Sequence, residues 1–252
     1  MLAAALPFMF AACGSEDPEE NFNLETTALE IDYEKTANIE TSVNGCTFTS
    51  DNEFIATVDK DGKVTANHVG EANITVAYNG ESATCKVTVK PTLMAYTMPV
   101  IDWSLNLSQV EDQVKVNFPA LIKNKENSSA DMLAYTTNGD FPIYTYAFAN
   151  NALKASTLMI SAAMDDRDSL GAWLEQYYEY YEDDESLTML YGNATSIVDA
   201  TLLVEFESAE TNCMATWTAN EPGSKTVRSG KIVDRTYIEK SREAARKTAG
   251  IK

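Results

Sequence analysis

The chain has 252 residues, 44% of them hydrophobic and 23% charged, a balance typical of globular proteins and not of disordered ones. It carries 19 Lys and Arg against 38 Asp and Glu, a formal net charge of −19 that repels phosphate backbones and anionic headgroups. The composition therefore argues against a nucleic-acid partner and against direct adsorption to a membrane surface.

Residues 1–12 are apolar without exception, and the apolar run stops abruptly at Cys13. A run this short does not span a bilayer as a helix and is typical of the hydrophobic region of a signal peptide. Residues 10–13 resemble a lipobox, which implies a signal peptide over 1–13 and lipidation of Cys13. Phe10 stands where that pattern prefers Leu, and no Lys or Arg precedes Cys13, so we infer that the true start lies upstream. The alternative is an ordinary hydrophobic helix with an incidental cysteine.

An acidic tether is expected over residues 14–22, with carboxylates at Glu16, Asp17, Glu19 and Glu20. It resembles the export signal of Bacteroides-type lipoproteins that reach the outer face of the outer membrane. The resemblance implies a lipid anchor in the outer membrane and a place on the cell surface. A solvated tether on a periplasm-facing lipoprotein has the same composition, so both faces of the membrane stay open.

Residues 21–90 are predicted to form an all-β sandwich. Short alternating segments rich in Val, Ile and Thr are separated every 8 to 12 residues by turn signals. Asp61-Gly62 is expected to close a tight hairpin between segments 54–59 and 63–67.

The order and spacing of these segments carry a family resemblance. Segments 48–52, 55–59, 62–66, 70–76 and 83–89 resemble the bacterial Ig-like group 2 family. The resemblance implies an immunoglobulin-like sandwich that serves as a stalk or adhesion module in exported proteins and has no catalytic residues.

The cysteines and the single histidine do not suggest a metal site. None of the four cysteines has the close spacing that zinc sites use. Cys46 and Cys85 are compatible with a disulfide in an exported protein and with two separate buried thiols, and Cys213 is unpaired in either case. His68 has no Cys or Asp partner at a catalytic spacing and is predicted to be a surface loop residue.

Residues 91–252 are predicted to form an α+β domain, because longer apolar runs and helical periods begin there. Ser108 and Glu111 have the spacing of a capping box, which predicts the start of a short helix. A C-terminal helix is expected from Thr236, three residues before Glu239.

A third helix is predicted after Asp168-Ser169, ending at the acidic run 182–185. The prediction depends on a single apolar stripe at helical spacing: Leu170, Trp173, Leu174, Tyr177, Tyr178 and Tyr181.

Two long hairpins are predicted between the helices. One follows Met132 and turns at 150–151, and the other follows Met189 and turns near 208–210. The similar spacing favours a helix-and-meander unit used twice. We expect one antiparallel sheet of about six strands, with the helices on a single face.

The tandem helix-and-meander pattern resembles the lipoproteins that support outer-membrane barrel assembly and the β-lactamase inhibitor proteins. Residues 96–99, followed by Asp102-Trp103, resemble the start of a domain in uncharacterised Bacteroides-type lipoproteins. Neither resemblance implies an activity.

Residues that could carry catalysis are sparse in this half of the chain. The one histidine lies in the Ig-like segment and no glycine-rich phosphate loop is present, so we expect neither a catalytic triad nor a cofactor. Asp165-Asp166 and the run 183–185 flank the predicted third helix and could serve a hydrolase. Such runs are more typical of solvated helix ends.

Trp103 and Tyr180 are candidate ligand contacts, because exposed aromatic faces stack on sugar rings. Tyr180 lies off the predicted apolar stripe, whereas the stripe around Trp173 fits core packing. The triplet 168–170 matches the acceptor pattern for O-glycosylation at Ser169, although a helix N-cap explains the same residues.

The sequence thus predicts a non-enzymatic cell-surface lipoprotein whose Ig-like stalk presents a C-terminal domain that binds a glycan or protein partner. Two other hypotheses are a carboxylate-dependent hydrolase of extracellular polymers and a periplasm-facing assembly or structural lipoprotein.

Overall fold

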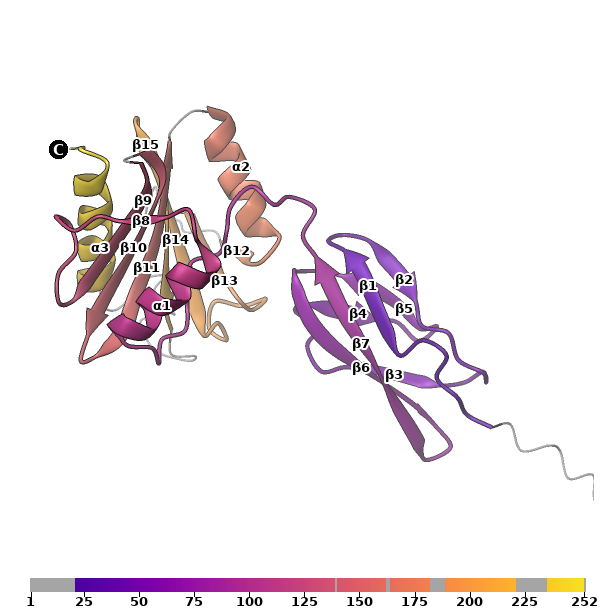
Figure 1. The fold of residues 1–252 in the computed structure, drawn as a ribbon. Coiled ribbons are helices and arrows are strands. Elements are labelled where there is room, and N and C mark those ends of the chain that lie inside the picture. The colour runs from indigo at the N-terminus through magenta and orange to yellow at the C-terminus, as the bar shows by residue number, and fades with distance from the viewer. Residues whose placement is uncertain (1–20, 139, 162–163, 182–188, 221–234, 252) are drawn as a thin grey trace, which may run out of the picture.

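The computed structural model describes residues 21–138, 140–161, 164–181, 189–220 and 235–251. This part of the chain is mostly β-sheet with three helices, and it forms two bodies that follow one another along the chain (Figure 1). Each body has its own buried apolar cluster.

The first body is a sandwich of two sheets, one with the strand order β1-β7-β6-β3 and one with the order β2-β5-β4. Its apolar cluster includes Ile31, Ile74 and Val87, which are nearly inaccessible to solvent. The strands are β1 (Ala28–Asp32), β2 (Thr36–Asn38), β3 (Thr47–Ser50), β4 (Ala56–Val58), β5 (Lys63–Ala66), β6 (Gly70–Tyr78) and β7 (Glu81–Lys90).

The hairpin predicted around Asp61-Gly62 is confirmed, since β4 pairs antiparallel with β5. Asp59 fixes the turn, because its Oδ1 accepts from the backbone N–H groups of Asp61 and Lys63, both at 2.9 Å. These two bonds hold the pKa of the Asp59 carboxyl below its ordinary value.

Gly62 in this turn is expected to tolerate no side chain. Its φ of +80° disfavours any side chain, and a Cβ there would meet Phe48 Cζ at 2.9 Å. Gly80 has a similar φ of +89° with nothing within 4 Å, so it is a matched control. We expect Gly62→Ala to lower the free energy of unfolding by about 2 kcal/mol or more, and Gly80→Ala by about 1 kcal/mol. Urea titrations measure both, and equal losses would contradict the contact with Phe48.

The second body is built on one eight-stranded antiparallel sheet with the order β12-β13-β14-β15-β11-β10-β9-β8. The prediction of about six strands missed the two short edge strands. The strands are β8 (Ile122–Lys123), β9 (Met132–Thr137), β10 (Asp140–Ala149), β11 (Ala152–Ser161), β12 (Glu179–Tyr181), β13 (Met189–Gly192), β14 (Leu202–Ser208) and β15 (Asn212–Ala219). The helices are α1 (Leu107–Asn117), α2 (Met164–Glu175) and α3 (Arg235–Thr248).

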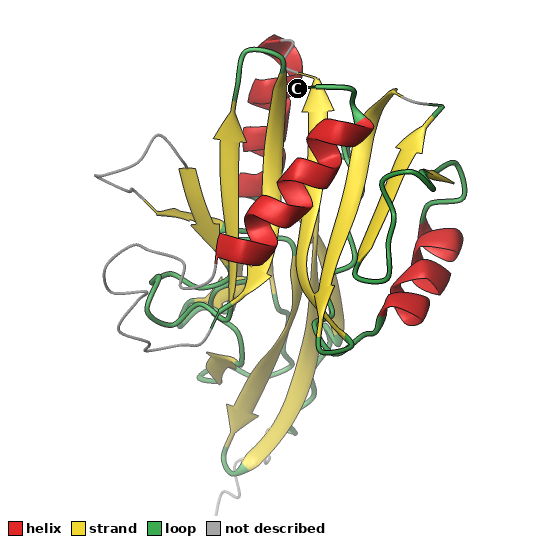
Figure 2. Cartoon of the chain, turned by 90° about the vertical axis from the view of Figure 1, so that its left-hand side faces the viewer, coloured by secondary structure: helices red, strands yellow, loops and turns green. Residues whose placement is uncertain are grey.

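Helices cover both faces of this sheet, so the prediction of a single helical face was wrong (Figure 2). Helices α1 and α2 pack on the face that carries Tyr146 and Trp217. Helix α3 packs on the opposite face, where its Ala245 joins Met159 and Met214. The physical reason is visible in β9, β11 and β15, which are buried at consecutive positions, as in strands covered on both sides.

Helix α1 begins earlier than the predicted capping box. Its N-cap is Asn106, whose side chain accepts from the backbone of Gln109, and the Gln109 side chain accepts from the backbone of Asn106. The same reciprocal pattern therefore forms two residues upstream. Val110 and Val114 are buried, as their spacing requires.

Helix α2 begins at Met164, so Ser169 lies inside it and not at an N-cap. The helix also stops at Glu175, and the predicted helical stripe continues as strand β12, where Tyr180 pairs with Tyr191. Tyrosine fits a half-buried sheet edge well, and pairing with β13 outweighs the helical period at this point.

The fold repeats one unit, a helix followed by four strands, first as α1 with β8–β11 and then as α2 with β12–β15. The last strands of the two units, β11 and β15, pair antiparallel at the centre of the sheet. The hairpins predicted to turn at 150–151 and near 208–210 are the β10–β11 and β14–β15 pairs.

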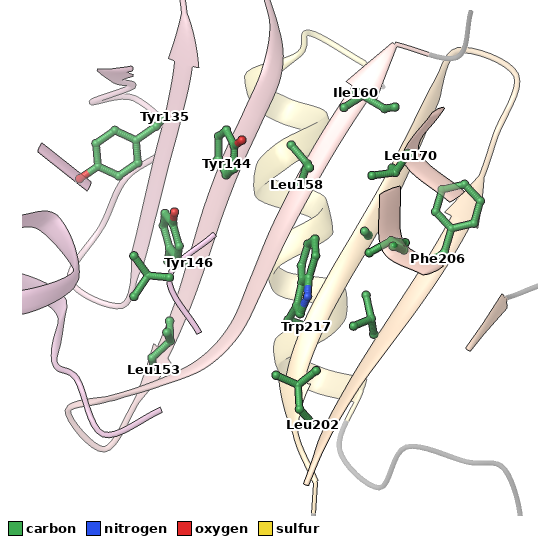
Figure 3. Packing of buried hydrophobic residues seen from close by; sticks show 14 of the residues in the cluster. Tyr135, Tyr144, Tyr146, Leu153, Leu158, Ile160, Leu170, Leu202, Phe206 and Trp217 are labelled. Carbon is green, nitrogen blue, oxygen red and sulfur yellow. The ribbon is translucent and has the colours of Figure 1, made fainter. Parts of the chain in front are cut away.

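The main core of the second body combines aromatic and aliphatic side chains (Figure 3). Trp217 and Trp173 are fully buried and meet edge to face, with ring centroids 6.3 Å apart. The indole N–H of Trp217 donates to Tyr178 Oη at 3.0 Å. Burial raises the pKa of the Tyr178 phenol, and the bond from Trp217 offsets only part of that effect.

Candidate functional site

The two bodies meet at a hydrogen-bonded joint built around Gln176, which is 2% exposed. Its Oε1 accepts from the backbone N–H groups of Thr92 and Leu93 at 2.7 and 2.9 Å, and its Nε2 donates to Leu93 O at 3.0 Å. Its backbone oxygen accepts from the N–H of Val69 at 2.6 Å. A buried side chain with every polar atom engaged holds its neighbours in one arrangement, so the joint fixes how the bodies follow one another.

His68 belongs to this joint, and its prediction as a surface loop residue was wrong. It is 8% exposed and stacks on Phe54, with ring centroids 3.9 Å apart and an interplanar angle of 5°. Its Nδ1 bonds Phe54 O at 2.8 Å, and its Nε2 lies 3.7 Å from a carboxylate oxygen of Glu179 in the second body. The loop is covered by the other domain, which a local sequence pattern does not reveal.

Tyr180 lies on the edge strand β12 and is 47% exposed, which agrees with its predicted exposure. Its ring lies 5.4 Å from that of the buried Tyr191, its partner on β13, and Met189, two residues before Tyr191 on the same strand, is 41% exposed. We call Tyr180 and Met189 the edge patch. Its aromatic and thioether surface offers an apolar contact to a ligand. Met189 was missed because a methionine at the start of a strand gives no functional signal.

Trp103, the other predicted ligand contact, lies apart from the edge patch. It is half-buried against the main core, in a segment that Leu105 ties to β11 through its oxygen and the N–H of Leu153. Strands β12 and β11 are four strand spacings apart in the sheet, about 19 Å. The structure therefore does not bring Trp103 and Tyr180 together in one site.

Several predicted sites have a different outcome or lie outside the described residues. Cys13, with the signal peptide 1–13, and the acidic run 183–185 are outside them. Ser169 is half-buried in the middle of α2, and its glycosylation stays a prediction.

Cys46 and Cys85 are two separate buried thiols in the structure, so the disulfide left open by the sequence is not formed. The strand order gives the reason, because β6 lies between β3, which Cys46 precedes, and β7, which carries Cys85. Two strand spacings are about 10 Å, beyond the reach of a disulfide. Burial raises the pKa of the Cys85 thiol.

Within the described ranges, no group of three or more His, Cys, Asp or Glu side chains is arranged to hold a metal ion. None of the helices described has the length and apolarity of a membrane span.

Comparison with known families decides the nature of the first body, the sandwich of β1 to β7. Residues 27–89 match the bacterial Ig-like domain (group 2). The predicted resemblance of this segment is thereby confirmed, and we call the first body the Ig-like domain and the second the C-terminal domain. A comparison with curated proteins finds no match for the chain.

Two solved structures are similar to the chain at low identity. An intimin mutant of EHEC O157:H7 shares 15% identity, with 42% of this chain and 73% of that chain covered, at a TM-score of 0.23. Domains 5–6 of the S-layer protein SbsC share 12% identity, with 82% and 85% covered, at a TM-score of 0.24. Similarity at these TM-scores carries no conclusion about fold or function.

Proposed function

We propose that this protein is an exported, lipid-anchored surface protein whose Ig-like domain is a stalk for a ligand-binding α+β domain. The bound partner is a glycan or a protein. In this proposal, Cys13 is the lipidation site and residues 14–22 are the tether in front of the stalk. The protein acts by binding and not by catalysis.

The observation that carries the proposal is an Ig-like domain joined through a buried glutamine to a second domain with an exposed aromatic edge. Because the polar atoms of Gln176 are hydrogen-bonded at the joint, the C-terminal domain is held in a fixed orientation relative to the Ig-like stalk. The edge patch then lies on a fixed surface, on a strand paired into the sheet. A binding surface held by regular structure loses little entropy when it engages a ligand.

The edge patch is tested with Tyr180→Ala/Met189→Ala on glycan arrays and against extracellular proteins. The matched control is Met94→Ala/Val116→Ala, which removes side chains that are 82% and 78% exposed. We expect the patch variant to bind its ligand at least about tenfold more weakly, and the control to bind like the parent chain. Equal binding by both variants would remove the edge patch from the proposal.

The location is tested separately. We expect the mature protein to enter the detergent phase of a phase-separation extraction and to be cleaved by protease added to intact cells. A Cys13→Ser variant is the control, since it cannot carry the lipid and should move to the aqueous phase. A parent protein found in the aqueous phase, or protected from protease, would refute the anchored surface protein.

A further inference from the structure

An open pocket of about 680 Å³ lies between the two domains. The Ig-like domain supplies most of its wall, including Tyr33, Glu53 and His68, and the C-terminal domain supplies Glu179 and Thr195. Backbone bonds hold the wall in place, because Tyr33 N–H donates to Lys90 O at 2.9 Å and His68 N–H donates to Ile55 O at 3.2 Å. The pocket is therefore formed by both domains, and backbone hydrogen bonds hold its lining residues in place.

The charged residues that line this pocket are all acidic. Three of its ten lining residues are glutamates, Glu34, Glu53 and Glu179, and none of the ten is Lys or Arg. The negative field reaches Tyr33, whose pKa is raised first by burial and then by Glu34, Glu175 and Glu179. Such a wall attracts cations and repels anions.

The hydrogen bonding of His68 offers a ligand a second acceptor when the ring is neutral. Phe54 O can only accept, so the 2.8 Å bond places a proton on His68 Nδ1. In the neutral form of His68, Nε2 is then an acceptor and faces a second acceptor, Glu179 Oε2, at 3.7 Å, whereas in the protonated form the same two groups make an ion pair. A nitrogen with two N–H groups can sit between acceptors at this separation and donate to both.

The pocket wall also contains two aromatic rings, Tyr33 and Phe54, beside small and polar residues. The Phe54 ring is stacked flat against His68, and Tyr33 stands in the same wall. Aromatic rings next to carboxylates bind ammonium and guanidinium groups, because the ring faces attract a cation that the carboxylates neutralise. A metal ion is the poorer fit, since no three ligating side chains converge within the described residues.

We propose that this interdomain pocket binds an organic cation with several N–H donors, the ammonium or guanidinium group of a lysine or arginine side chain on a partner protein. A free polyamine has the same chemistry and is distinguished by the test. Tyr180 projects from β12 to the side opposite Glu179, so the pocket and the edge patch are separate surfaces. The binding proposed for the pocket and the binding proposed for the edge patch are therefore tested independently, and a negative result for one does not refute the other.

The test is a calorimetric titration of the full chain at low salt with an end-blocked trilysine peptide. Two comparison ligands are titrated in the same way: the same peptide with acetylated side chains, and spermidine. The pocket variant is Glu53→Gln/Glu179→Gln. Its control, Glu81→Gln/Glu210→Gln, makes the same change of net charge with one exposed glutamate from each domain. Urea midpoints confirm that all variants are folded.

We expect trilysine to bind the parent chain and the control alike, the pocket variant about tenfold more weakly, and the acetylated peptide not at all. Spermidine binding as tightly as trilysine would support the pocket and assign a free polyamine as its ligand. Equal weakening in the pocket and control variants would overturn the proposal, because it would mean attraction to the net charge alone. Binding of the acetylated peptide at full strength would also overturn it.

Discussion

Replacing Arg242 by Met is expected to destabilise the C-terminal domain by about 3–5 kcal/mol, the cost of leaving a buried charge without its partner. The Arg242 side chain is 1% exposed, and its guanidinium lies 3.3 Å from a carboxylate oxygen of Glu205, which is 4% exposed. It also lies 2.9 Å from Glu207, and its Nε donates to Thr216 Oγ1 at 3.1 Å. One side chain of α3 therefore neutralises carboxylates on β14 and bonds to β15.

Two comparison variants isolate this effect. Lys247→Met breaks an exposed pair of the same helix with Glu243, and we expect no measurable loss of stability from it. Arg242→Met/Glu205→Leu removes both buried charges and should recover much of the loss, because an apolar pair needs no compensation. Urea unfolding gives the free energies, and hydrogen exchange of α3 shows whether the helix opens first. If Arg242→Met costs no more than Lys247→Met, the buried pair does not hold the helix.

The same interface explains why the covered faces of the sheet could not be predicted from the sequence. The strands under α3 carry Thr145, Thr157 and Thr216 beside small apolar residues, and these threonines bond to Ser241 or Arg242 of the helix. Polar positions in alternation indicate a solvated face, and the sequence gives no sign that a helix satisfies them. The local pattern was read correctly as a sheet and wrongly as a sheet with one open face.

Elements specified by neighbouring residues were predictable. The turn at Asp61-Gly62 and the hairpin at Asn150-Asn151 follow from residues that tolerate positive φ, and the structure has φ of +80° at Gly62 and of 50° and 60° at the two asparagines. Features made by distant residues were not predictable. The joint brings Val69 to Gln176, more than one hundred positions away in the sequence, and neither residue type indicates such a contact.

Candidate site residues follow the same division. The exposure of Tyr180 was predictable because it falls off an apolar stripe, which is a local property, even though the stripe belongs partly to a strand and not to one helix. His68 was misplaced because its burial depends on Phe54 and on Glu179 of the other domain. A solitary histidine in a loop gives no indication of what will pack against it. Composite sites such as the interdomain pocket therefore need the fold before they can be seen.

Trp217→Ala is the second large effect that we expect, a loss of about 3–5 kcal/mol in the unfolding free energy of the C-terminal domain. Trp217 is fully buried on β15, which pairs with β14 on one side and with β11 on the other. Truncation leaves a cavity next to Trp173 and removes the N–H donor of Tyr178. The loss should be measured by urea unfolding followed through a probe other than Trp fluorescence.

Trp217→Phe separates the two parts of this effect. It keeps most of the ring volume and leaves Tyr178 Oη without its indole donor, so we expect a smaller loss of about 1–3 kcal/mol. Its ligand binding should equal that of the parent chain, because a fully buried ring cannot touch a sugar, whereas Tyr180→Ala/Met189→Ala should lose binding without losing stability. A folded Trp217→Phe protein that no longer bound ligand would place the aromatic cluster at a binding surface and contradict its position in the core. Exposure thus separates the buried tryptophan pair, Trp173 and Trp217, from Tyr180 on the edge strand, which is 47% exposed.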